Sequence, residues 1–507
     1  MKKSVLLALF VAFTANLMAQ SVALSESFSN FWYRRFMITD APAGQDADNL
    51  YYFAKPRVQS KKMTDYVLVV DKNTMQASEI AISITAKYSL LDGIVTGNNI
   101  IALYNSLNKK GDQVIFSIAN IDKSDKTVTL DDNNSVSTSA NPKYWPEYKC
   151  AKSPDGKMLA TLVMVTGKDN RLENLFAVVV NDQGEFAWSG PVTPDFGGQT
   201  FSLGNLTVDN EGNLCIPAYT CQMKGNNISN VNLMVIKANG DGTNSFTQDI
   251  NFGTPQDFTS KILKDGNLAV AGYFTDSKTN TATKTSGYFF YKFDISSESF
   301  GDINEFRFDD KYAGKDQWVR FSNILGNQQY AIHADDIYEL EDGSLALCGE
   351  HRFLKFYTGG TSPSYYQLLT KNILVSKFMP DGTALFTMIE KQQTATMAIN
   401  PSEDWTPVNI SYTAFTKGND IYFLFNDDQL NIPYPGKGVV FDPSGMGFKK
   451  KGESVLMHLT PDMKLTQRII HEPNQMLRGV EFVDGDYFYA SGLGKNQLFL
   501  NKYSINE

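Results

Sequence analysis

Residues 341–353, EDGSLALCGEHRF, have three close relatives elsewhere in the chain. These are PDGKMLATLVM (154–164), NEGNLCIPAYT (210–220) and KDGNLAVAGYF (264–274). Each begins with a turn rich in Asp, Asn and Gly and continues with apolar residues, a pattern typical of a tight turn followed by a partly buried strand. The phrase therefore marks a repeated structural unit.

Less regular copies of this phrase begin at residues 48, 96, 417 and 483. A second phrase, an apolar strand that often has a Lys near its end, follows each copy and begins at residues 66, 114, 175, 233, 288, 373, 455 and 498. Between one unit's second phrase and the next unit's first phrase there is room for two more strands. Each unit therefore has four strands, A to D, in which the first phrase is B and the second is C.

Repeated four-stranded antiparallel sheets of this kind are the sequence signature of a β-propeller. The sequence predicts an all-β fold, a single propeller with eight blades by the count of C strands. Seven blades remain an alternative, because the first unit lacks a clear A strand. Two sandwiches or two smaller propellers are disfavoured by the even spacing. The last unit stops after its C strand, so we expect an N-terminal strand to close the ring, with FWYRRFMIT (31–39) as the candidate.

The first nineteen residues have the pattern of a cleaved secretory signal: Lys2 and Lys3, an apolar run, and small residues ending at Ala19. We therefore expect a signal peptide over 1–19 and a propeller domain over 20–507. The apolar run is shorter than the roughly 20 residues that span a bilayer. The expected location is the periplasm, the outer-membrane surface or the extracellular space.

The composition disfavours one class of partner. The formal net charge of −9 and a pI near 5.2, without a block of Lys and Arg, lack the electrostatic footprint of a nucleic-acid binder.

The chain has four cysteines. A disulfide between Cys150 and Cys215 across neighbouring repeats remains an alternative, and the favoured interpretation is that the cysteines are small buried thiols.

The unit EDGSLALCGEHRF…KNILVSKFMPDGTALFTMIEKQQ resembles the blades of secreted β-propeller repeat proteins common in Bacteroidetes bacteria. Their repeats run Asp-Gly-x-hydrophobic-x-hydrophobic-x-Gly, then an apolar strand ending in Lys and a hydrophobic residue, then an Asp-Gly turn. The resemblance covers most of the chain after residue 20 and is clearest over 336–470. It implies the propeller fold and export, and many members of such families have no assigned activity.

The long insertions point to one face of the ring. In a propeller the B-to-C and D-to-A connections leave the same face, and loops on a rigid scaffold are where binding residues concentrate. The long connections here are of these two kinds, at about 309–335, 351–371, 391–408 and 427–452. Their aromatic and charged side chains suit a protein or glycan partner, whereas the alternative is that they form each loop's own small core. The candidate binding residues are Trp318, Arg320, His351, Arg352, Tyr357, Tyr365, Tyr366, Trp405, Asp427, Asp428 and Tyr434.

The sequence offers little that favours catalysis. It has four histidines and no HExxH or paired metal-ligand spacing, so we expect neither a metal site nor a cofactor, and His458 in a C strand is expected to be structural. The carboxylate pairs 309/310, 335/336 and 427/428 suit a glycosidase in principle, but adjacent acids in turns are usually solvated. The favoured hypothesis is a non-catalytic binding propeller; the alternatives are a hydrolase or lyase acting on carbohydrate at the channel mouth and a structural envelope component.

Overall fold

The Asp-Gly turn of the repeated phrase shapes the first hairpin of several blades. Gly343 has a φ of 78°, the left-handed region that favours glycine, and Asp342 Oδ1 accepts a hydrogen bond from the backbone N–H of Ser344 at 2.9 Å. The N–H of Leu340 donates to the Ser344 carbonyl at 2.9 Å and closes the hairpin. Gly156 and Gly266 repeat this conformation, with φ of 71° and 82°. The same turn therefore joins strands A and B in several blades.

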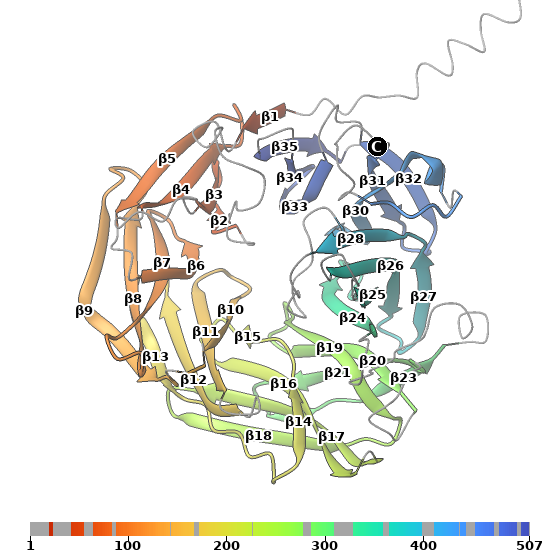
Figure 1. The fold of residues 1–507 in the computed structure, drawn as a ribbon, viewed down its shortest axis with the longest axis horizontal. Coiled ribbons are helices and arrows are strands. Elements are labelled where there is room, and N and C mark those ends of the chain that lie inside the picture. Colours follow the sequence, from red (N-terminus) through yellow and green to blue (C-terminus); the bar gives the residue numbers. More distant parts are fainter. Residues whose placement is uncertain are drawn as a thin grey trace, which may run out of the picture.

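The structure is a computed structural model of the chain. It describes residues 20–23, 42–54, 64–83, 88–141, 143–144, 146–166, 172–225, 227–276, 285–308, 328–357, 365–397, 410–434, 437–442, 452–470, 476–493 and 498–505. These residues form eight antiparallel sheets arranged around a central axis (Figure 1). The prediction of an all-β propeller with eight four-stranded blades is confirmed.

The first four blades follow one another along the chain. Blade 1 contains β2 (Gly44–Gln45), β3 (Asn49–Ala54), β4 (Thr64–Asp71) and β5 (Ala77–Ser83). Blade 2 contains β6 (Tyr88–Val95), β7 (Asn99–Leu107), β8 (Gln113–Asp122) and β9 (Val128–Ser139). Blade 3 contains β10 (Glu147–Lys152), β11 (Met158–Thr166), β12 (Leu172–Asn181) and β13 (Phe186–Pro191). Blade 4 contains β14 (Thr200–Leu203), β15 (Thr207–Val208), β16 (Leu214–Lys224), β17 (Asn227–Asn239) and β18 (Gly242–Asp249).

The remaining blades complete the ring. Blade 5 contains β19 (Thr254–Ile262), β20 (Leu268–Thr275), β21 (Gly287–Asp294), β22 (Ser299–Phe300) and β23 (Asn304–Arg307). Blade 6 contains β24 (Gln328–Glu339), β25 (Leu345–Tyr357), β26 (Tyr365–Phe378), β27 (Ala384–Ile389) and β28 (Gln393–Met397). Blade 7 contains β29 (Tyr412–Lys417), β30 (Asp420–Asp428), the 3-10 turn η3 (Gln429–Asn431), β31 (Gly452–Leu459) and β32 (Leu465–Ile470). Blade 8 contains β33 (Met476–Asp484), β34 (Tyr487–Leu493), β35 (Leu498–Ser504) and β1 (Gln20–Ala23).

The ring closes through an N-terminal strand, as expected, but a different one from the candidate. β1 pairs antiparallel with β35, with Gln20 opposite Lys502 and Ala23 opposite Phe499. The predicted segment 31–39 lies outside the described residues. A four-residue strand is enough to complete the ladder, and so short a strand leaves little signal in the sequence. The A strand of blade 1 was difficult to recognise for the same reason, because β2 has two residues.

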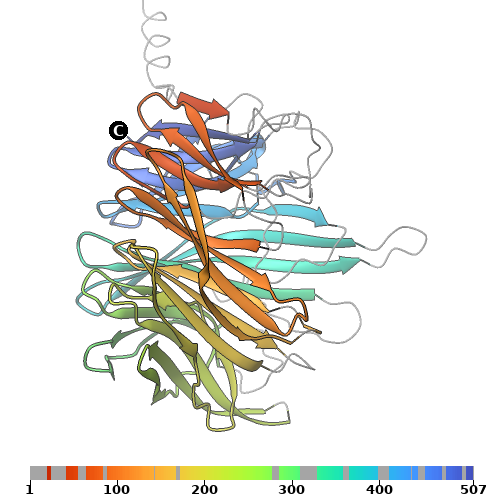
Figure 2. The ribbon, with the colours of Figure 1, turned by 90° about the vertical axis from the view of Figure 1, so that its left-hand side faces the viewer.

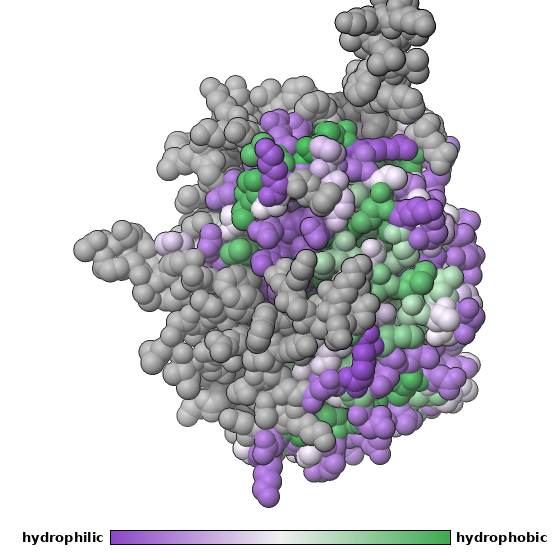
Figure 3. Space-filling view, turned by 90° about the vertical axis from the view of Figure 1, so that its right-hand side faces the viewer, coloured by the Kyte–Doolittle hydropathy of each residue, from purple (hydrophilic) through white to green (hydrophobic). Residues whose placement is uncertain are grey.

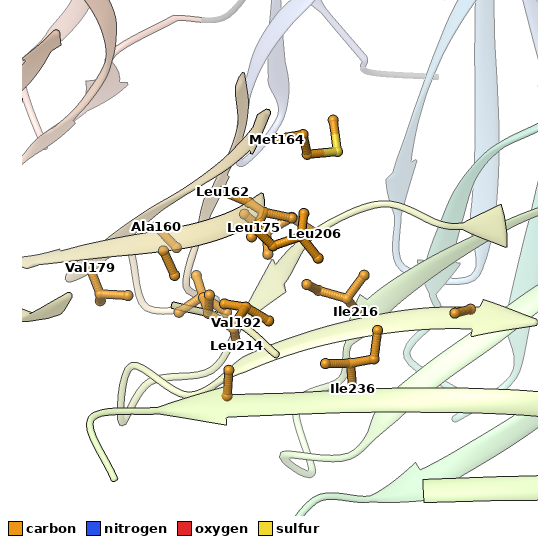
Figure 4. Close-up of a cluster of buried hydrophobic side chains, with 14 of the residues drawn as sticks. Ala160, Leu162, Met164, Leu175, Val179, Val192, Leu206, Leu214, Ile216 and Ile236 are labelled. Carbon is orange, nitrogen blue, oxygen red and sulfur yellow. The ribbon is translucent and has the colours of Figure 1, made fainter. Parts of the chain in front are cut away.

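Neighbouring blades are held together by layers of buried aliphatic side chains. Between blades 3 and 4, Leu162 and Val179 from β11 and β12 face Leu214, Ile216 and Ile236 from β16 and β17 (Figure 4). Fully burying one such side chain stabilises the fold by about 1.5–3 kcal/mol relative to leaving it exposed. Each blade therefore depends on the next to cover its face, which is why the same strand pattern recurs around the ring.

Candidate functional site

Blade 6 extends beyond its neighbours on one face of the ring. β25 and β26 have 13 and 14 residues and remain paired as far as Tyr357 opposite Tyr365, so their outer part projects as a hairpin (Figure 2). The predicted insertion at 351–371 is thus largely a continuation of the sheet and not an irregular loop. This gives the B-to-C connection of blade 6 a regular backbone framework.

A second connection joins blade 6 to blade 7 on the same face. The D strand of blade 6 is interrupted after β27 and resumes as β28, where Gln393 pairs in parallel with Phe441 from the B-to-C connection of blade 7. The N–H of Thr394 donates to the Phe441 carbonyl at 2.8 Å, and the Phe441 N–H donates to the Gln392 carbonyl at 2.9 Å. We call the hairpin end (351–357 and 365–371), β28 and residues 429–434 and 437–442 the platform.

Four charged side chains lie together beneath the platform, and we call them the charge cluster. Glu350 and Lys391 have 0% of their side chains exposed, and Lys391 Nζ lies 2.5 Å from Glu350 Oε1. Arg352 donates from Nε to Glu350 Oε2 at 2.9 Å and from Nη2 to Asp335 Oδ1 at 2.7 Å. The two cations and two carboxylates offset each other's charge, as buried ionic groups require.

Polar side chains extend the charge cluster into blade 7. At the start of that blade's inner strand, Ser411 Oγ donates to Glu350 Oε2 at 2.6 Å and Tyr412 Oη donates to Asp335 Oδ2 at 2.9 Å. Gln393 accepts from Lys391 Nζ at 3.0 Å and donates to the Asn426 carbonyl at 2.6 Å. The network therefore ties strands of blades 6 and 7 to the interrupted D strand that carries the platform.

Burial and pairing move the pKa values of the two carboxylates in opposite directions. Burial raises the pKa of Asp335 to about 6, against the opposing effect of Arg352, although 22% of its side chain still reaches solvent. Burial also acts to raise the pKa of Glu350, but Lys391 and Arg352 outweigh it and hold that pKa below its usual value. Burial lowers the pKa of Lys391, partly offset by Glu350. Asp335 is consequently the carboxylate of the charge cluster whose pKa lies above its usual value.

β-Bulges interrupt the register on both sides of the charge cluster. The pairing of β24 with β25 shifts between Ala334 and Asp336, so Asp335 is the extra residue, and the pairing of β25 with β26 shifts between Glu350 and Arg352. Bulges redirect side chains relative to the regular pleat. The inner strand of blade 5 has a similar bulge next to Asp257, whose Oδ2 lies 3.3 Å from His333 Nδ1 on β24.

The predicted binding residues occupy different environments. Arg352 belongs to the charge cluster, His351 is buried in β25, and Tyr365 stands 36% exposed on the hairpin. Tyr366 packs on Leu368, Ala395 and Ile410. Trp318, Arg320 and Trp405 lie outside the described residues, and Tyr357 is placed only as the last residue of β25.

Three more of the predicted residues have local structural contacts. Tyr434 Oη accepts from the Glu390 N–H at 2.9 Å. Asp427 Oδ1 accepts from Asn431 Nδ2 at 2.7 Å, and Asp428 accepts from the Leu430 N–H at 2.9 Å, capping η3. These contacts correspond to the alternative reading in which loop side chains form the loop's own core.

Glu350 and Lys391 were not among the predicted site residues, and Asp335 was considered only as part of a chance acidic pair. The sequence did contain a signal for Glu350 and Lys391. A Glu inside the apolar strand LALCGEHRF and a Lys after LFTMIE interrupt the expected pattern of apolar and polar residues. An isolated buried charge is rare unless it is paired. The partners are about 40 residues apart in sequence, so the pairing itself was not predictable.

Other chemical expectations can be compared with the described residues. His458 lies in β31, with Nε2 2.9 Å from Asp420 Oδ1 and its ring stacked on Tyr422, which fits a structural role. The four cysteines are free thiols. Within the described ranges, no three His, Cys, Asp or Glu side chains gather as metal ligands, and no helix is long and apolar enough to cross a membrane.

Comparisons with known proteins show likeness in fold. No family model matches the sequence, and no curated protein matches it. Three solved structures are similar in architecture. The β-propeller domain of the trilobed protease from Pyrococcus furiosus has 10% identity, covering 84% of this chain and 97% of that one, with a TM-score of 0.35. A periplasmic gluconolactonase from Pseudomonas aeruginosa has 9% identity, covering 90% of this chain and 99% of that one, with a TM-score of 0.37.

The third structure, the polysaccharide lyase Uly1, has 11% identity, 82% and 89% coverage and a TM-score of 0.36. Identities of 9–11% and TM-scores of 0.35–0.37 mark all three as remote likenesses. Their different activities carry no argument about its chemistry, because one fold supports many unrelated functions.

Proposed function

We propose that the protein is an exported, non-catalytic binding propeller whose loop-rich face holds a protein or glycan partner. The platform on blades 6 and 7 is the observation that carries this proposal. It is built from two long connections that are hydrogen-bonded to each other, so its backbone is fixed before a partner arrives. Preorganised loops lose less conformational entropy on binding than loose ones.

The charge cluster supports a scaffolding role in this proposal. Arg352 is held by two carboxylates, and Lys391 is fully buried against Glu350, so most of the charge is used inside the protein. Tyr365 on the projecting hairpin instead offers a large amphipathic side chain at low entropic cost, the property that makes Tyr frequent in binding surfaces. The aromatic candidates Trp318 and Trp405 belong to the same proposal from the sequence alone.

Capture experiments with matched tyrosine variants test the proposal. The chain from Gln20 to Glu507 is used to capture proteins from native envelope extract and is applied in parallel to a glycan array. Tyr365→Ala should weaken capture of the identified partner about tenfold, the effect of losing one aromatic anchor. Tyr487→Ala is the control, because Tyr487 is similarly exposed at 41% but follows the short A-to-B turn of blade 8, on the opposite face. Equal loss in both variants, or no specific partner in either assay, would contradict the proposal.

One observation favours a second candidate, a hydrolase or lyase acting on carbohydrate. Asp335 combines partial exposure with a pKa of about 6, near a second carboxylate with a lowered pKa, and such separated pKa values are typical of acid–base pairs. This candidate predicts turnover of a polysaccharide that is lost in Asp335→Asn while thermal stability and partner capture persist. An Asp335→Asn variant with unchanged turnover would eliminate it.

A further inference from the structure

A groove separates the outer parts of blades 5 and 6, away from the platform. It measures about 450 Å³ and is bordered by β21 and β23 of blade 5 and by the C-to-D turn of blade 6. The short A-to-B turn at Gly343 also borders it, so it opens toward the face opposite the long insertions. On the edge of the ring that lies at the right in Figure 1, apolar patches lie among polar surface (Figure 3). A volume of this size is in the range of small-ligand sites.

Aromatic rings line the apolar wall of the groove. Phe290 and Phe378 stack with their ring centroids 4.9 Å apart, and Phe306 lies 5.8 Å from Phe378. Phe378 is nearly buried, whereas Phe290 and Phe306 are partly exposed. The rings come from both blades, so the wall is held by the packing between the blades. Partly exposed ring faces attract cations through their quadrupole.

Carboxylates from both blades stand at the rim. Asp302 lies between β22 and β23, and Asp381 lies in the C-to-D turn of blade 6. Hydrogen bonds from the Thr383 side chain and backbone lower the pKa of Asp381, so it stays ionised. Lys292, the cation that lines the groove, lies 3.3 Å from Asp265 and is offset by it. Two negative charges therefore remain at the rim without a compensating cation among the lining residues.

We propose that this groove binds a basic side chain, Arg or Lys, presented by an extended segment of a partner polypeptide. The methylene stem of such a side chain would lie along Phe290 and Phe306 while the cationic end reaches Asp302 and Asp381. Two carboxylates, one from each blade, match the charge of this ligand and repel an anionic one. The proposal is independent of the platform, because no residue of the groove belongs to it.

Short peptides provide the test. N-acetyl-Gly-Arg-Gly-amide and its Lys counterpart are titrated into the full chain and followed by saturation-transfer NMR, with citrulline and norleucine peptides as neutral controls. We expect dissociation constants on the order of 1 mM for the basic peptides, at least tenfold weaker binding for the neutral ones, and weakening as salt rises. Equal binding of basic and neutral peptides would overturn the proposal.

Matched variants locate the binding. The double variant Asp302→Asn/Asp381→Asn should weaken binding about tenfold, and Phe306→Leu, which keeps the wall apolar, should weaken it a few-fold. The control is Asp125→Asn/Asp241→Asn, because both carboxylates are exposed in turns of other blades. Asp125 also accepts a hydrogen bond from the backbone N–H two residues later, as Asp381 does. Unchanged binding in the groove variants, loss in the control, or preferential binding of a neutral sugar at the same site would each overturn the assignment.

Discussion

The junction between blades 3 and 4 and the junction between blades 6 and 7 are built on different principles. The first is a continuous layer of aliphatic side chains, among them Leu214 and Ile236. The second has an apolar layer too, but adds the charge cluster toward the loop-rich face. Aliphatic packing is non-directional, whereas paired charges require particular distances and partners. The comparison suggests that apolar layers assemble the ring and that the charge cluster fixes the position of the platform.

Breaking the charge cluster should have the largest effect. Lys391→Met keeps the apolar stem but removes one of the two cations that pair with the buried Glu350 and leaves Arg352 alone against two carboxylates, so we expect the free energy of unfolding to fall by about 3–5 kcal/mol. Chemical denaturation measures this change. The double variant Lys391→Met/Glu350→Gln should recover part of the loss, since no uncompensated charge remains.

Lys377→Met provides the matched control in the same blade. Lys377 is also almost fully buried, but its partner Asp342 is partly exposed at 3.3 Å, so its removal leaves a carboxylate that water can reach. We expect a loss of no more than about 1 kcal/mol for this pair. Equal losses for the two Lys variants would mean that burial of the partner does not determine the cost.

At the junction between blades 3 and 4, the free energy of unfolding should fall when a cavity is created and should not depend on charge. Leu214→Ala in β16 removes buried methyl groups facing blade 3, and we expect a loss of about 3 kcal/mol in the free energy of unfolding. This loss should be the same at pH 5 and pH 8, because no titratable group is changed. A strong pH dependence would mean that the two junctions are energetically coupled.

The titration of Asp335 in the charge cluster should change the free energy of unfolding by a smaller amount. The pKa of Asp335 is about 6 in the folded protein, above its value near 4 in the unfolded chain, so the folded state binds the proton more tightly between these values. The wild type therefore loses stability as the pH rises through this window. Relative to wild type, Asp335→Asn should gain about 2–3 kcal/mol in the free energy of unfolding between pH 4 and pH 7, since Asn does not titrate. A difference that stays constant with pH would contradict the raised pKa.

The sequence predicted the repetitive parts of the molecule well for a physical reason. An Asp-Gly turn such as Asp342-Gly343 is a local structure. The left-handed conformation of its glycine and the hydrogen bond from the Ser344 N–H to the Asp342 carboxylate depend on neighbouring residues alone. The charge cluster is different: Lys391 and Glu350 are far apart in sequence, and their contact exists only once β25 and β28 are in one blade. The closing strand β1 was missed because four residues carry too little pattern, although the need for such a strand was clear.

Asp427 and Asp428 look like a catalytic pair in the sequence but have separate local roles. Asp428 caps η3 from a partly buried position, so Asp428→Ala should lower the free energy of unfolding by about 1 kcal/mol. Asp427 is buried and accepts from Asn431, so Asp427→Ala should cost more, about 1–3 kcal/mol, because it removes one of the two acceptors of that buried amide. If either variant instead kept full stability and lost partner capture or turnover, the pair would act on a ligand, and the platform would be a reactive surface and not only a fixed one.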